Sequence, residues 1–60
     1  MKLKSTILPR VIVSLYSNDI DTTYAVIVTD RKTRQQRTIT AVGIYAAEGA
    51  FAAACQRGRV

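Results

Sequence analysis

The chain has 60 residues, with nine Lys and Arg against four Asp and Glu, a formal net charge of +5 and one cysteine. This length allows one small domain, which buries only about 60% of its unfolded surface and is marginal as a monomer. A single cysteine excludes an intrachain disulfide, and the lack of histidine argues against a structural zinc site. A second chain is the remaining source of stability, so we expect a homodimer.

The first third of the chain predicts a flexible lead-in followed by a strand. Residues 1–9 are basic and apolar and end at Pro9, which cannot donate a hydrogen bond within a sheet. Residues 10–17 are rich in β-branched and large apolar side chains, as strands are. Alternation places Ile12 and Tyr16 on the face opposite the valines, so both faces of this strand are largely apolar.

A turn follows, with Asp19 and Asp21 one residue apart. A calcium loop also needs a glycine and a terminal glutamate, which are missing here, so we expect no metal site. Residues 23–30 form the second predicted strand, and its two faces are again apolar.

A polar hairpin loop over residues 30–37 concentrates the positive charge of the chain. It holds Arg31, Lys32, Arg34 and Arg37, which are four of the nine Lys and Arg residues. A solvated loop is one interpretation. An electrostatic contact with phosphate groups or with an acidic protein is the other.

Residues 37–43 predict the third strand, and residues 45–57 predict the only helix. An apolar stripe at i, i+3, i+4, i+7 and i+8, which runs from Ala47 to Cys55, is typical of a helix packed on a sheet. Gly58 is placed to end the helix as its C-cap. On this stripe Cys55 is expected to pack as a small hydrophobe.

These elements predict an α+β fold: a three-stranded antiparallel meander followed by one C-terminal helix packed on one sheet face. One helix covers one face, and its own outer face carries unusually small side chains. We therefore expect a second copy of the chain to cover the remaining apolar surface, with sheet packed on sheet or helix packed on helix. The expected dimer-interface residues are Ala46, Gly49, Ala52, Ala53, Ile12 and Tyr16.

Catalytic residue sets are missing from this sequence. There is no histidine, no serine in a nucleophile-elbow pattern, and the three glycines are too dispersed for a phosphate loop. We expect no enzyme and no cofactor. The lone thiol is typical of a reducing compartment, and the apolar stretch 41–55 is shorter than a membrane span, so a cytoplasmic protein without membrane association is expected.

Two stretches match a known pattern. The strand 24–29 ends in Asp30 with Arg31 and Lys32 following, and residues 43–50 pass from Gly-x-aromatic into an alanine-rich helix start. Over about half of the chain this resembles the three-strand-plus-helix DNA-binding domain of plant ethylene-response factors and of the arm-binding region of phage-type integrases. That resemblance implies a DNA-binding architecture. The arginines with which those domains read bases from the sheet have no counterpart between Val11 and Thr29.

Two functions follow as hypotheses. The first is a small basic accessory or regulatory protein that binds nucleic acid mainly through backbone phosphates, without specificity or with weak specificity. The second is a phage- or plasmid-type interaction module that binds and regulates or inhibits a host protein, through an apolar sheet face with a basic rim. The expected nucleic-acid-binding residues are Arg31, Lys32, Arg34, Arg37, Arg57 and Arg59.

Overall fold

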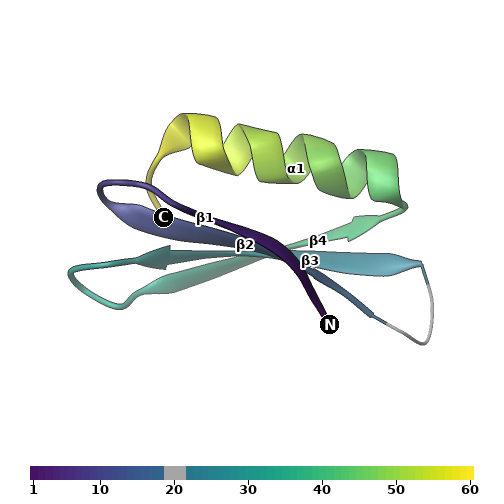
Figure 1. Ribbon diagram of the computed structural model, residues 1–60, viewed down its shortest axis with the longest axis horizontal. Helices are drawn as coiled ribbons and strands as arrows, with labels where there is room; N and C mark the ends of the chain where they lie inside the picture. The colour runs from purple at the N-terminus through teal and green to yellow at the C-terminus, as the bar shows by residue number, and fades with distance from the viewer. Residues whose placement is uncertain (19–21) are drawn as a thin grey trace.

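The computed structural model describes residues 1–18 and 22–60 and contains an antiparallel sheet covered on one face by a helix (Figure 1). The strands follow one another in the sheet in chain order. They are β1 (Lys2–Ile7), β2 (Val11–Ser17), β3 (Thr23–Asp30) and β4 (Gln36–Val42), and the helix is α1 (Ile44–Arg57). The predicted α+β class, with an antiparallel sheet and one C-terminal helix, is confirmed. The predicted Asp19 and Asp21 turn lies outside the described residues.

The sheet has four strands, so the prediction of three was wrong. Residues 2–7, expected to be part of a flexible lead-in, form β1 and pair with β2, with Thr6 opposite Val13 and Ile7 opposite Ile12. The amide of Leu8 donates to the carbonyl of Val11 at 2.8 Å and closes the turn between the two strands. Pro9 occupies that turn, where its missing N–H is not needed by any ladder.

Successive side chains of a strand point to opposite faces of the sheet, and this alternation determines which residues form the core. Val11, Val13 and Leu15 of β2 lie beside Val26 and Val28 of β3, and all five are buried under α1. The helix contributes the matching stripe, with Ala47, Phe51 and Ala54 buried at i, i+4 and i+7. Within the described residues, no helix covers the opposite side of the sheet.

The ends of α1 are defined by two glycines. Gly43 has a φ of 87° and precedes the first turn, while Gly58 has a φ of 66° and donates its amide to the carbonyl of Ala54 at 3.1 Å. The left-handed backbone of Gly58 is typical of the residue that caps the C-terminus of a helix, and it favours glycine. The predicted cap at Gly58 is therefore confirmed.

Candidate polyanion-binding end

The topology gathers most of the positive charge at one end of the molecule. In an antiparallel meander the β1–β2 turn and the β3–β4 turn lie at the same end, and β4 starts there. The helix starts at the far end and returns, because its 14 residues span about 21 Å and the seven of β4 span about 23 Å. We call this the basic end; its cations are Arg10, Arg31, Lys32, Arg34, Arg37, Arg57 and Arg59.

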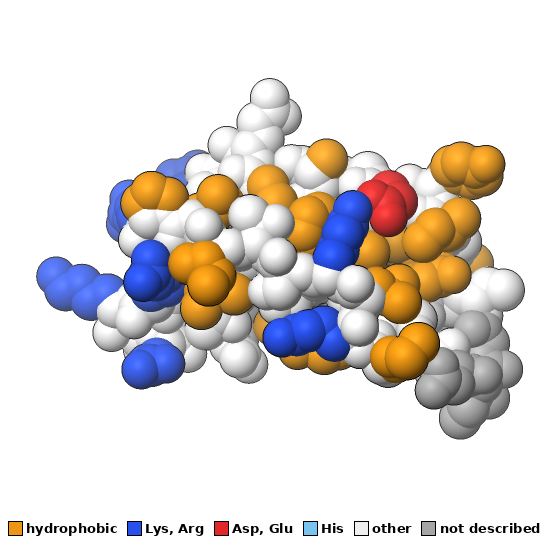
Figure 2. All heavy atoms as spheres, viewed as in Figure 1, with side chains coloured by type: hydrophobic (Ala, Val, Ile, Leu, Met, Phe, Trp, Pro, Cys, Tyr) orange, Lys and Arg blue, Asp and Glu red, His pale blue; other side chains and the backbone are white. Residues whose placement is uncertain are grey.

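These seven side chains are all exposed, and among the described residues none of them forms an ion pair. They make up seven of the nine Lys and Arg in the sequence, the other two being Lys2 and Lys4 of β1. Figure 2 shows blue side chains gathered at the left of the view, over the two turns and the end of α1. The net charge of the chain is thus distributed unevenly along its long axis.

Hydrogen bonds from Arg31 to two backbone carbonyls hold the two turns of the basic end together. The amide of Arg31 donates to the carbonyl of Arg10 at 2.9 Å, and the Nη1 of Arg31 donates to the carbonyl of Leu8 at 3.0 Å. The first bond extends the β2–β3 ladder by one pair beyond the strands. Arg10 and Arg31 therefore occupy neighbouring, fixed backbone positions in spite of their like charge.

Asp30 organises the hairpin tip. Its Oδ1 accepts hydrogen bonds from the amides of Thr33 at 2.9 Å and Lys32 at 2.8 Å, an arrangement typical of Asp at the start of a turn. These two amide bonds, chiefly that of Thr33, lower the pKa of Asp30 from its usual 3.8, with a smaller contribution from the charge of Arg10. Asp30 is thus an anion that shapes the basic loop.

Arg34 occupies a backbone conformation that side chains rarely adopt. Its φ is 68°, and it is the one non-glycine residue with positive φ in the described part of the chain. Its amide donates to the carbonyl of Asp30 at 2.9 Å, which closes the loop. A left-handed residue other than glycine costs about 1–2 kcal/mol. The chain thus retains a cation where glycine would be more stable.

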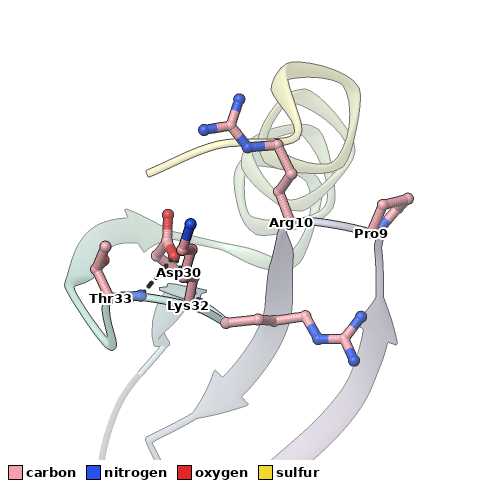
Figure 3. A pocket seen from close by; sticks show the side chains of 6 residues that line it. Pro9, Arg10, Asp30, Lys32 and Thr33 are labelled. Atoms are coloured by element: carbon pink, nitrogen blue, oxygen red, sulfur yellow. Dashed lines mark hydrogen bonds between the residues drawn. The ribbon is translucent and has the colours of Figure 1, made fainter.

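An open depression of about 240 Å³ lies between the two turns. Figure 3 shows Pro9 and Arg10 on one turn and Asp30, Lys32 and Thr33 on the other, and Arg31 completes the lining. Three cationic side chains therefore border one concave surface. Anionic groups such as phosphate oxygens suit this lining, because charge-assisted hydrogen bonds from Arg and Lys are about twice as strong as neutral ones.

All six predicted nucleic-acid-binding residues lie at the basic end. Arg10 was not among the predicted nucleic-acid-binding residues, although it begins the first predicted strand. The signal for it was topological: the start of one strand and the end of its antiparallel neighbour must lie side by side. Arg10 is thus adjacent to Arg31 in the sheet although 21 positions separate them.

The residues predicted for a dimer interface are divided between two faces. Ala46, Gly49, Ala52 and Ala53 are exposed on α1, whereas Ile12 and Tyr16 are half-buried on the sheet face away from the helix. One two-fold interface cannot contain both sets. Among the side chains that β2, β3 and β4 direct to that open face, none is charged; they are mainly Ile, Thr, Ala and Ser.

Several other features bear on the sequence predictions. The thiol of Cys55 is half-buried and packs against the core. Within residues 1–18 and 22–60 no three metal-ligating side chains lie close enough to share an ion. The one helix of the described chain is too short to cross a membrane. No protein-family model, no curated protein and no solved structure matches this chain.

Proposed function

We propose that this chain is a small nucleic-acid-binding accessory or regulatory protein that contacts mainly backbone phosphates. The observation that carries the proposal is the position of seven exposed cations at one end of the fold, none of which forms an ion pair with another described residue. Each phosphate neutralised by Lys or Arg releases counterions, and this release supplies most of the affinity of sequence-independent binding. A surface of this kind orients the chain on a nucleic acid but carries no base code.

The strained conformation of Arg34 supports the same proposal. Backbone strain of this kind is retained where the surrounding structure enforces it and is concentrated at functional positions. At this position a cation is present at the expense of stability. A phosphate contact would supply the reason.

The open sheet face argues for weak sequence specificity. Reading base edges requires donors such as Arg, Asn or Gln that reach into a groove. The strands β2, β3 and β4 direct Gln36 and no arginine or asparagine to that face. The resemblance to three-strand-plus-helix DNA-binding domains thus extends, in this proposal, to binding of the backbone and not to their mode of base recognition.

The test compares two charge-neutralising variants, Lys32→Gln at the basic end and Lys2→Gln at the opposite end of β1. Binding of a short labelled DNA duplex and of a single-stranded RNA is measured by fluorescence anisotropy between about 50 and 200 mM salt. The wild-type protein is expected to bind with a steep salt dependence. Lys32→Gln should weaken binding and reduce the slope of log K against log salt by about 1, whereas Lys2→Gln should leave that slope unchanged.

Two results would refute the proposal. One is the lack of measurable binding of either nucleic acid at about 50 mM salt, where phosphate contacts are strongest. The other is an equal effect of Lys32→Gln and Lys2→Gln, which would mean that net charge alone acts and that the basic end is not a site.

A second candidate function is an interaction module that regulates or inhibits a host protein. The open face of β2, β3 and β4, to which these strands direct no charged side chain, favours it, since the centre of a protein interface is depleted in charged residues. A partner that stays bound after nuclease treatment and is released by Ile27→Lys on this face would support this function. Loss of the same partner on nuclease treatment would support nucleic acid binding instead.

A further inference from the structure

The outer edge of β4 presents an unpaired row of backbone groups. β4 is the last strand of the sheet. Two hydrogen bonds just beyond its ends, from Asp30 N–H to Gln35 C=O and from Gly43 N–H to Thr22 C=O, establish which of its residues bond to β3. Antiparallel hydrogen bonding alternates, so the odd-numbered residues of β4 bond to β3. The even-numbered residues Gln36, Thr38, Thr40 and Val42 then direct both N–H and C=O outward, and the described chain has no strand beyond them.

The other edge of the sheet is protected in the way natural edge strands are. β1 carries Lys2 and Lys4, and its register with β2 shifts between these two residues. Lysines and irregular pairing both discourage a further strand from adding to an edge. β4 has a regular register over all its residues, and its one charged side chain, Arg37, lies near its start. The chain thus blocks one edge and leaves the other open.

We propose that a second copy of this chain pairs with β4, antiparallel, about a two-fold axis at Ile39. In this register Ile39 lies opposite Ile39 of the partner subunit, and Thr38 lies opposite the partner's Thr40. Gln36 then lies opposite the partner's Val42. All outward N–H and C=O groups of Gln36, Thr38, Thr40 and Val42 find partners, and the two sheets become one continuous sheet. A shift by two residues in either direction would leave some of these groups unpaired.

The distribution of charge favours a second copy as the occupant. Two chains that each carry +5 repel one another unless their cations are kept apart. In the antiparallel pair the two basic ends point in opposite directions, and β4 spans about 23 Å between them. The seam itself contains mainly neutral side chains, Thr38, Ile39 and Thr40 at its centre. The one cation that β4 offers to an acidic partner strand is Arg37, near its start.

The helix agrees with this arrangement. Glu48 lies toward β1, where it contacts Lys4, so helical geometry turns Ala46, Ala50 and Ala53 toward β4. These small side chains put no bulky group on the side of α1 that faces the seam. A two-fold axis beside β4 brings the same side of the partner helix toward them. Two of the six predicted dimer-interface residues, Ala46 and Ala53, thus lie on the side of α1 nearer the seam, whereas Ile12 and Tyr16 do not.

The test is a cysteine scan of β4 in a Cys55→Ser background. Opposed residues that do not exchange hydrogen bonds have Cα atoms about 4.5 Å apart, within the range a disulfide spans. Only position 39 opposes itself in the proposed register. Ile39→Cys should therefore form a disulfide-linked dimer under mild oxidation, whereas Thr38→Cys and Thr40→Cys, the matched controls, should stay largely uncrosslinked. Preferential crosslinking at position 38 or 40 would overturn the proposal.

A second measurement keeps the proposal falsifiable if Ile39→Cys does not fold. Light scattering should give the wild-type protein twice the 6.6 kDa of one chain. Thr40→Pro removes one outward N–H and spares the β3–β4 ladder, so it should lower the dimer fraction at least tenfold, whereas Thr40→Val should not. A wild-type monomer at the highest soluble concentration, or a dimer unaffected by Thr40→Pro, would overturn the proposal. The seam does not depend on nucleic acid binding.

Discussion

Lys4 on the first strand and Glu48 on the helix form an ion pair with 2.6 Å between Nζ and Oε2, although 44 positions separate them in the chain. The same ammonium group lies 4.6 Å from the centre of the Phe51 ring. The pair joins the edge strand β1 directly to α1.

We predict that Lys4→Ala lowers the free energy of unfolding by about 1 kcal/mol. Both charged side chains of the pair are nearly half exposed, so the ion pair contributes about 0.2–1 kcal/mol, and the ring contact about 0.5–1 kcal/mol more. Urea unfolding followed by circular dichroism measures the effect. Lys4→Met, which retains the aliphatic stem over Phe51, should lose less. The loss of unfolding free energy in Lys4→Ala should become smaller in high salt, because salt screens the ion pair. A loss that does not change with salt would mean that packing, and not charge, is its cause.

The same contact explains why β1 was missed from the sequence. Residues 2–7 combine two lysines with polar and apolar side chains and lie shortly before a proline, which is typical of a mobile terminus as well as of an edge strand. What distinguishes the two is a carboxylate and an aromatic ring on a helix more than 40 residues later. Such a contact is invisible to local periodicity.

The buried part of the fold, by contrast, could be predicted from the sequence. The valines of β2 and β3 and the stripe from Ala47 to Ala54 follow the strand and helix periods, because the same burial fixes both the pattern and the structure. The grouping of cations at the basic end could be predicted only in part from the sequence. Residues 31–37 are contiguous, but Arg10 and Arg57 join them through the order of strands and the return of the helix, which are properties of the whole chain.

Asp30 provides a prediction for pH. Its pKa is lowered by the amides of Thr33 and Lys32, so its charged form stabilises the folded hairpin. This stability is fully present above the unfolded pKa of about 3.8 and is lost as the pH falls through the lower folded pKa. Asp30→Asn should therefore be less stable than the wild type near neutral pH and should approach it in strong acid. Thermal unfolding as a function of pH measures this.

The control for this prediction is Asp30→Ala. Asn retains an oxygen that can accept from an amide, whereas Ala retains none, so Asp30→Ala should be the less stable variant and should remain so in acid. If the stability gap between the wild type and Asp30→Asn stayed constant down to about pH 2, the charge of Asp30 would not be its cause.

Substitutions of Arg34 should distinguish its effect on stability from its effect on nucleic acid binding. Arg34→Gly should raise the free energy of unfolding by up to about 1 kcal/mol, because glycine adopts a φ of 68° without a steric penalty. It should at the same time weaken nucleic acid binding. Arg34→Ala, which keeps the strain and loses the charge, should weaken binding equally without the gain in stability. If Arg34→Gly bound nucleic acid as tightly as the wild type, the strain at this position would have no part in the proposed function.

Two glycines of the helix region should respond to alanine in opposite directions. Gly58 has a φ of 66°, so Gly58→Ala should lower the free energy of unfolding by about 1 kcal/mol. Gly49 has ordinary helical backbone, and a Cβ added there meets no atom within 4 Å, so Gly49→Ala should raise stability by about 1 kcal/mol. Chemical denaturation of the two variants at low protein concentration measures both. A loss of stability in Gly49→Ala that grows with protein concentration would place Gly49 in contact with a second chain, because only a contact between subunits makes stability depend on concentration.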